Sequence, residues 1–474
     1  MSEAPIKAKV LACIVSVLLS GCAVGPTYHP PKVSLPSAWL GAKEKDQSSI
    51  VTGQSADLAR WWQQFQDPAL TSLVEEALKA NLSLALAEAS LRQARALRGI
   101  ASAGLLPSAT ASGTIQRQSG GLYGVNGGSR NLFQTGFDAA WELDLFGGVR
   151  RNVESANANV QAAIENIRDV QVSIAAEVVI DYVQLRGYQQ QIVVARNSLK
   201  GQQQTLGITR KLYQVGFDSG LDIATAESTL ATTESQIPVL EANARQSIYA
   251  LSVLLARHPG DLVERLSSTG DLPAIPEEIS AGLPSDLLRR RPDIRQAEAQ
   301  LHSATAQIGV AVAQLFPQFS LTSGGSFQNS LSRSLFLGPA VTWPIFQGGA
   351  IVSNIHAQEA LRDQAFITYQ QTVLTALQDV ENALIAFAEE QKHDKSLRDA
   401  VAADRTAVDL SLRLFQEGQT NFLSVLTAQG TLYTDESALT QSRENLAADL
   451  IALYKALGGG WEENSYNPAA PRAK

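Results

Sequence analysis

The residues best suited to chemistry are spread thinly along this chain. Its histidines are His29, His258, His302, His356 and His393, and no two of them have the helical spacing that binds one metal ion. The sequence also lacks a G-x-x-x-x-G-K-[ST] phosphate loop and a G-x-S-x-G nucleophile turn. Its many carboxylates lie on segments whose pattern predicts a solvated helix face. We therefore expect neither an enzyme nor a metal or cofactor site.

The N-terminus has the pattern of an exported protein. Lys7 and Lys9 precede an apolar run over residues 10–19. A helix that stays in the membrane needs about 20 apolar residues, so this shorter run is typical of a cleaved signal peptide. We expect a signal peptide over residues 1–21.

The residue after this signal is the one cysteine that we expect to be modified. Leu19-Ser20-Gly21-Cys22 resembles a bacterial lipobox, whose cysteine receives a lipid and becomes the first residue of the mature protein. We expect a covalent lipid on Cys22, and Ala23 in place of an aspartate favours the outer membrane. Cys13 would leave with the signal, so no disulfide is expected in the mature chain. The alternative is a cytosolic protein with an apolar N-terminus and a buried cysteine.

Composition and charge exclude a nucleic-acid partner. The chain has 474 residues, a formal net charge of -8 and a pI near 5.3, whereas phosphate binding requires clustered Lys and Arg. Its one basic run, 289–291, is short, and we interpret it as a solvated helix start. Abundant Ala, Leu, Gln, Ser and Val favour long helices.

The chain contains a tandem duplication. Three pairs of similar segments occur in the same order, and fixed spacings in sequence are the mark of repeat architectures. The pairs are 78–107 with 288–317, 144–148 with 344–348, and 212–216 with 414–418.

Each repeat begins with an Ala-rich helical stretch that a proline ends. These stretches cover 82–104 and 293–314. The segments that follow alternate weakly between apolar and polar residues, as membrane strands of about 9–11 residues do. They are 108–118, 131–143, 318–329 and 334–343. Because a barrel needs about eight strands, either these form an ordinary small sheet or several chains pool them.

Long coiled-coil helices follow the strands in each repeat. A residue pattern of period seven predicts helices over 149–213 and 350–414, each about 65 residues or 100 Å long at 1.5 Å per residue. Each is followed by a second helix with the same period, and the Gly-containing segments 215–220 and 417–421 predict the hairpin turns. A cytosolic coiled-coil scaffold would explain the helices but neither the lipobox nor the strands.

Six motifs in order then identify a family. They are 22–28, 61–70, 141–147, 288–294, 344–349 and 454–461. Together they resemble the TolC-like outer-membrane efflux proteins, and within that family the NodT-type lipoprotein branch that serves resistance-nodulation-division pumps.

The resemblance implies a mainly α fold with a membrane β part. It implies a homotrimer in which each protomer gives four strands to a shared twelve-stranded β-barrel and its long hairpins to a periplasmic α-barrel. The implied function is passive export of drugs or other small toxic compounds through the outer membrane. The implied partners are a periplasmic adaptor, an inner-membrane resistance-nodulation-division transporter and outer-membrane lipid.

The resemblance also implies a periplasmic gate at the hairpin tips. Segment 421–426 resembles the constriction, with Leu423 as an apolar plug and Asn421 as a polar ring. Family members often carry Asp after this segment, whereas this chain has Thr427, so an acidic ring there is in question.

Other tip residues have two possible roles. Asp222 is either an acidic partner in the gate or a cap on the helix that follows, with Arg210 and Arg413 as candidate cations. The glycines of the tips, which we expect to serve the turns first and adaptor contact second, are Gly216, Gly220 and Gly418.

These observations predict a division of the chain into six parts. They are a signal peptide (1–21), a lipidated segment and belt (22–69), repeat 1 (70–257), a belt linker (258–284), repeat 2 (285–457) and a C-terminal tail (458–474). Two other functions fit parts of this pattern. A protein-secretion exit duct would use the same fold, and a structural lipoprotein would space the envelope without conducting.

Overall fold

The computed structural model describes residues 23–40, 50–51, 58–118, 129–276, 279–280, 282–328 and 332–462. The predicted signal peptide and Cys22 lie outside these residues. The chain forms two compact units. The strand unit comprises Met1–Val33, Glu88–Asn166 and Asp293–Thr372, and the hairpin unit comprises Ser34–Ala87, Ile167–Pro292 and Val373–Lys474.

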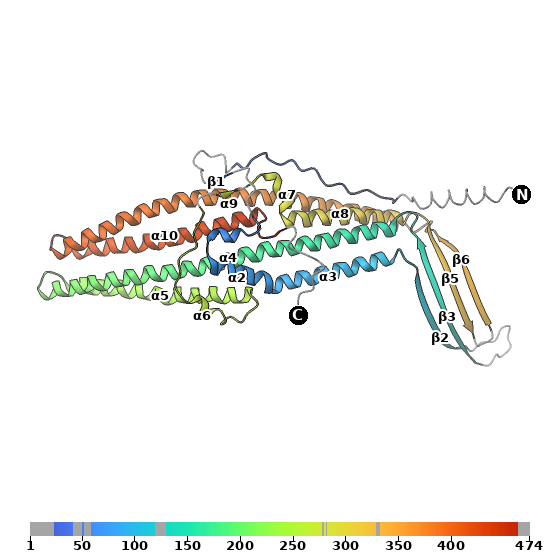
Figure 1. The fold of residues 1–474 in the computed structure, drawn as a ribbon, viewed down its shortest axis with the longest axis horizontal. Helices are drawn as coiled ribbons and strands as arrows, with labels where there is room; N and C mark the ends of the chain where they lie inside the picture. Colours follow the sequence, from blue (N-terminus) through green and yellow to red (C-terminus); the bar gives the residue numbers. More distant parts are fainter. Residues whose placement is uncertain are drawn as a thin grey trace. The chain divides into compact units, whose positions relative to one another are not determined.

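Four long helices dominate the fold (Figure 1). Helices α4 (Gly148–Gln214) and α9 (Ala350–Gln416) have 67 residues each, and α5 (Gly220–Leu254) and α10 (Phe422–Ala456) have 35 each. The predicted long helices are confirmed to within two residues, because an uninterrupted heptad pattern specifies a helix locally. The equal lengths confirm the internal repeat. No helix in the described part of the chain is long and apolar enough to cross a membrane.

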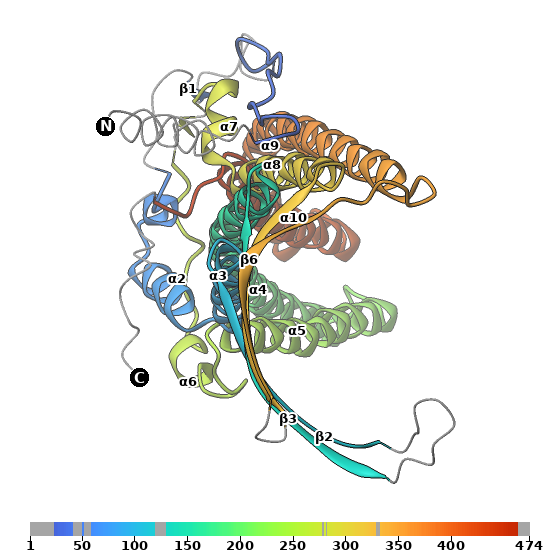
Figure 2. The same cartoon turned by 90° about the vertical axis from the view of Figure 1, so that its right-hand side faces the viewer.

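The strand unit contains one antiparallel sheet, which Figure 2 shows as a long curved ribbon. Its strands are β2 (Ser108–Gln118), β3 (Arg130–Leu143), β5 (Gln318–Gln328) and β6 (Ser332–Thr342), in the order β2-β3-β5-β6. The two hairpins therefore meet at β3 and β5, where Phe137 lies opposite Gly325. The four predicted strands are confirmed to within two residues at each end.

The same contact recurs where each sheet hairpin joins its helices. Helices α3 (Leu82–Ala103) and α8 (Pro292–Ala313) precede the two hairpins. Trp141 Nε1 donates to the Leu105 carbonyl at 3.0 Å, and Trp343 Nε1 donates to the Leu315 carbonyl at 3.0 Å. In each repeat a tryptophan thus satisfies a carbonyl just before the proline that ends the helical stretch.

Short elements complete the hairpin unit. They are β1 (Ile50–Val51), η1 (Trp61–Phe65), α2 (Pro68–Ala80), α6 (Val263–Leu266), β4 (Ile279–Ser280), η2 (Pro284–Asp286) and α7 (Leu287–Arg290), and β1 pairs with β4 in parallel. The buried Trp61 ring stacks on Tyr454 with centroids 5.2 Å apart. Asp67 accepts a hydrogen bond from Tyr182 at 2.6 Å and caps α2. These aromatic contacts attach the short elements to α4 and α10.

Candidate functional site

The two helical hairpins of the hairpin unit end in turns of the same design. In the first, Phe217 N donates to the Leu212 carbonyl at 3.0 Å, and in the second, Gln419 N donates to the Leu414 carbonyl at 2.8 Å. This six-to-one bond is the Schellman motif, which needs a residue of positive φ. Gly216 and Gly418 supply it, with φ of +82° and +73°. Gly216 and Gly418 therefore form the turns, whereas Gly220 is the first residue of α5.

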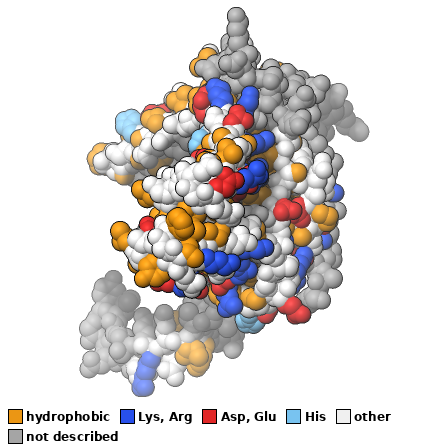
Figure 3. All heavy atoms as spheres, turned by 90° about the vertical axis from the view of Figure 1, so that its left-hand side faces the viewer, with side chains coloured by type: hydrophobic (Ala, Val, Ile, Leu, Met, Phe, Trp, Pro, Cys, Tyr) orange, Lys and Arg blue, Asp and Glu red, His pale blue; other side chains and the backbone are white. Residues whose placement is uncertain are grey.

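An apolar cluster joins the two hairpins just behind their turns. We call it the tip core. Its buried members come from all four long helices, and they are Leu206, Ala226, Phe415, Phe422 and Val425. The Phe415 and Phe422 rings lie 6.1 Å apart. Because its members come from both repeats, this cluster couples the two tips. Figure 3 faces the hairpin tips and shows apolar, acidic and basic side chains side by side on them.

The predicted gate residues of the second hairpin lie at the start of α10. Asn421 is the N-cap of this helix, and its Oδ1 accepts from Ser424 N at 3.1 Å. Leu423 is 63% exposed and does not belong to the tip core, unlike Phe422 before it. Thr427 Oγ1 donates to the Leu423 carbonyl at 2.8 Å. The chain therefore presents an apolar side chain at Leu423, while the Thr427 hydroxyl bonds to its own helix.

Asp222 takes part in a helix cap in the first hairpin. Ser219 is the N-cap of α5, and the Asp222 carboxylate accepts from Ser219 N at 3.1 Å and Ser219 Oγ at 2.6 Å. The sequence left Asp222 either as an acidic gate partner or as a helix cap; the N-cap is Ser219, and Asp222 completes a capping box with it. Burial and the neighbouring Asp222 raise the pKa of Asp218 above its usual value. The first tip thus holds two acids close together.

The two candidate cations bond to acids other than Asp222. Arg210 Nη2 donates to Glu227 at 2.7 Å, and Arg413 Nη2 donates to Asp409 at 2.5 Å. Both pairs are exposed, so each stabilises its own hairpin by at most about 1 kcal/mol.

A buried polar contact ties the hairpins together farther from the tips. Gln429 Nε2 of α10 donates to Thr205 Oγ1 of α4 at 2.9 Å. The Thr205 hydroxyl also donates to the Gly201 carbonyl at 3.1 Å. We did not identify this pair from the sequence. The signal available was a polar residue at an inward-facing heptad position of each helix.

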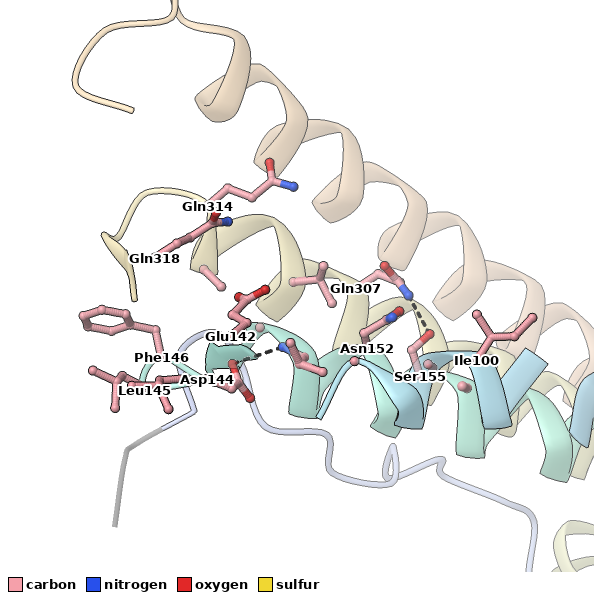
Figure 4. Close-up of a pocket in the computed structure, with 18 of the residues that line it drawn as sticks. Ile100, Glu142, Asp144, Leu145, Phe146, Asn152, Ser155, Gln307, Gln314 and Gln318 are labelled. Carbon is pink, nitrogen blue, oxygen red and sulfur yellow. Dashed lines mark hydrogen bonds between the residues drawn. The ribbon is translucent and has the colours of Figure 1, made fainter. Parts of the chain in front are cut away.

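The strand unit contains a cavity of about 560 Å³ beside the β3–α4 turn. Figure 4 shows its polar lining, in which Gln307 Nε2 donates to Ser155 Oγ at 2.8 Å and Asp144 Oδ1 accepts from Val149 N at 3.1 Å. Apolar side chains such as Ile100 and Phe146 complete the wall. None of the predicted site residues that the structure describes lines this cavity. Across the described residues, no three His, Cys, Asp or Glu side chains are arranged to hold a metal ion.

Comparisons with known proteins agree with this architecture. The family model named outer membrane efflux protein matches residues 73–257 and 283–459, one segment in each repeat. Nodulation protein T of Rhizobium leguminosarum bv. trifolii is 32% identical over 469 residues, which cover 96% of this chain and 97% of that protein. The toluene efflux pump outer membrane protein TtgF of Pseudomonas putida is 31% identical over 478 residues, which cover 98% and 99%.

Solved structures share the fold over nearly the whole chain. The outer-membrane channel OprN matches with a TM-score of 0.84 and 36% identity, over 93% of this chain and 100% of that one. Both the repeated family match and this structural match confirm the mainly helical fold with four strands and an internal repeat. The chain therefore belongs to the outer membrane efflux protein family.

Proposed function

We propose that three copies of this chain form a duct through the outer membrane. Each protomer gives its four strands to one shared twelve-stranded β-barrel. The observation that supports this most directly is the sheet order β2-β3-β5-β6, which leaves β2 and β6 as edges. A four-stranded sheet cannot close, because a membrane barrel needs about eight strands, and exposed edges pair with other chains. Pooling the edges of three protomers satisfies both requirements.

The duct is the passive exit of a tripartite efflux pump. The long helical hairpins reach into the periplasm and meet an adaptor, which connects them to an inner-membrane resistance-nodulation-division transporter. The adaptor contacts the turns formed around Gly216, Gly220 and Gly418. The cargo is a drug or another small toxic compound, in keeping with the toluene efflux named for one relative. The transporter supplies the energy and chooses the cargo.

The proposed anchor and domain division follow from the sequence. A lipid on Cys22 holds the mature N-terminus in the outer membrane. Repeats 1 and 2 span 70–257 and 285–457, and they are flanked by belt segments 22–69 and 258–284 and the tail 458–474.

The resting gate lies at the hairpin tips. Leu423 is exposed at the start of α10, and three copies around an axis place an apolar ring in the duct. Asn421 adds a polar ring, and Asp222 contributes negative charge at the first tip. Because Thr427 is not acidic, closure depends on the Leu423 ring more than on repelling charges. Opening is an iris-like change between two packings that the adaptor biases.

The duct itself is tested with the purified full-length chain. We expect a trimer in native mass measurements and discrete pores in planar lipid bilayers. A stable monomer without conductance would refute the proposal. Crosslinking in the native membrane would identify the adaptor and the pump.

The gate is tested by Leu423→Ser. A polar ring admits water where an apolar ring excludes it, so we expect a higher resting conductance and faster antibiotic influx. Leu221 is the equivalent residue of the first repeat and is 75% exposed, so Leu221→Ser is the matched control. Equal effects of the two substitutions on conductance would contradict a specific role of Leu423 in closing the gate.

A further inference from the structure

Residues 23–28 of the strand unit lie across α4 and α8. We call this segment the staple. Val24 N donates to the Phe146 carbonyl at 3.0 Å, just before α4 begins. The buried Arg151 of α4 donates in return, from Nε to the Val24 carbonyl at 3.2 Å and from Nη2 to the Gly25 carbonyl at 3.4 Å. The backbone of the staple is therefore held by hydrogen bonds to repeat 1.

The other side of the staple lies against repeat 2 at very short range. A Cβ on Gly25 would lie 2.5 Å from the Gly309 Cα of α8, and Gly25 has a φ of +86°. On the side of repeat 1, a Cβ on Gly147 would likewise lie 2.7 Å from the Ala23 Cα. Real side chains do not tolerate such distances, so glycine is required at both contacts.

A second contact holds the end of the staple. The Tyr28 ring stacks on His302 of α8 with centroids 4.3 Å apart, and its hydroxyl donates to Glu298 at 3.2 Å. His302 lies 2.9 Å from Glu154 of α4, which also accepts from Arg151 at 2.8 Å. Burial and the charge of Glu298 raise the pKa of Tyr28, which keeps its hydroxyl a donor.

The seam between α4 and α8 is itself polar. Ser155 and Ser303 share a hydrogen bond of 2.8 Å, and Arg295 donates to the fully buried Glu165 at 2.9 Å. Buried ion pairs add little net stability, because desolvation offsets their attraction. The seam joins the two repeats, and residues 23–28 lie across it with hydrogen bonds to α4 and close backbone contact to α8.

We propose that residues 23–28 clamp the two repeats together beside the strands, and that the lipid on the preceding residue keeps this clamp seated. The second half of this statement rests on the proposed lipidation of Cys22. The anchor then does more than tether the protein. It couples attachment to the membrane with the packing of α4 against α8 next to the sheet.

Seating of the staple is tested by a thiol crosslink. In full-length Tyr28→Cys/His302→Cys, a short bifunctional thiol reagent joins the two cysteines, because the rings that they replace stack with centroids 4.3 Å apart. We expect peptide mapping to find the 28–302 crosslink, and adding Gly25→Val to abolish it. Gly99→Val is the matched control, because a Cβ there meets nothing within 4 Å. A crosslink that persists with Gly25→Val would overturn the clamp.

The effect of the clamp on stability is tested by the lifetime of the proposed trimer on heating. We expect Gly25→Val to shorten that lifetime several-fold, and Gly99→Val to leave it unchanged. A Cys22→Ser chain, exported from a signal that adds no lipid, should show the same shortening of the trimer lifetime. The double variant Cys22→Ser/Gly25→Val should have a lifetime no shorter than either single variant. Additive losses would overturn the coupling to the lipid. The 28–302 crosslink forms within one chain and can be measured whether or not a trimer exists, so a failure of the duct proposal would be seen separately, in native mass and conductance.

Discussion

The two hairpins share one backbone and differ in their polar residues. Both consist of helices of 67 and 35 residues joined by a Schellman turn. In the first hairpin, Gln202 Nε2 donates to Thr233 Oγ1 at 3.0 Å. The equivalent residues of the second, 202 positions later, are Asp404 and Asp435. Burial and a hydrogen bond to Asp435 raise the pKa of Asp404. The two repeats thus share one scaffold, and the second carries a titratable pair where the first carries a neutral one.

The tips differ in the same way. Phe217 is 83% exposed in the first turn, whereas Glu417 and Gln419 surround the glycine of the second. In the proposed duct, the adaptor would therefore meet an exposed aromatic side chain in the turn of one hairpin and polar side chains in the turn of the other.

The largest expected effect comes from truncating Phe422, an aromatic side chain of the tip core, which contains residues of both hairpins. Phe422→Ala should cost about 3–5 kcal/mol, because Phe422 is buried between the hairpins in the tip core. Trypsin should then cut faster at Lys211 of the first hairpin and at Arg413 of the second. Leu423→Ala is the control, since Leu423 is exposed. Faster cleavage at Arg413 alone would show that the tips are independent.

A buried acid distinguishes the hairpins at their far ends. Glu444 of α10 is buried against Gly187 of α4, and burial raises its pKa to about 7. The equivalent pair is Ala242 with Glu389, which is exposed and bonds to Lys392 at 2.7 Å.

Glu444→Gln should therefore stabilise the protein at pH 8 by on the order of 2 kcal/mol. A raised pKa means that the folded state binds the proton more tightly. Its contribution is present below about pH 4.5 and is lost as the pH rises through 7. The variant should remove this loss in denaturation curves measured from pH 4.5 to 8. Glu389→Gln should change little, and an equal effect of both would contradict the assignment.

The helix caps should contribute equally despite their different chemistry. Asn421→Ala and Ser219→Ala each remove an N-cap, at a cost of about 1 kcal/mol. Hydrogen exchange of the Ser424 and Asp222 amides measures the two losses separately. Asn421→Asp should retain protection, because a carboxylate also caps. A loss at only one tip would show that the other cap is redundant.

The smallest effect is the pH response of the second hairpin. Because the pKa of Asp404 is raised, the folded state binds its proton more tightly, and the stability that this proton adds is lost as the pH rises. Arg405 and Glu436 lie next to this pair and bond at 2.7 Å. Hydrogen exchange measured upward from about pH 4, where an unfolded Asp loses its proton, and corrected for the intrinsic rate, should show the second hairpin loosening more than the first.

Exchanging the two pairs provides the control. Asp404→Gln/Asp435→Thr should abolish the response, and Gln202→Asp/Thr233→Asp should transfer it to the first hairpin. A response that stays with the second hairpin in both variants would place its cause elsewhere.

The sequence by itself determined the elements of this protein. Heptad spacing, helix-ending prolines and turn glycines are local signals, so the long helices and the four strands were predicted to within two residues. The internal repeat was visible for the same reason, because duplicated segments keep their order and spacing.

Only the tertiary structure decided how individual side chains are used. The bonds of Asp222 to Ser219 show its part in the capping box, which the sequence left as one of two roles. The tip core, the Gln429–Thr205 bond and the seat of residues 23–28 on α8 each join residues about 200 or more positions apart. No local pattern encodes such contacts, since they depend on which helix faces come together when both repeats pack.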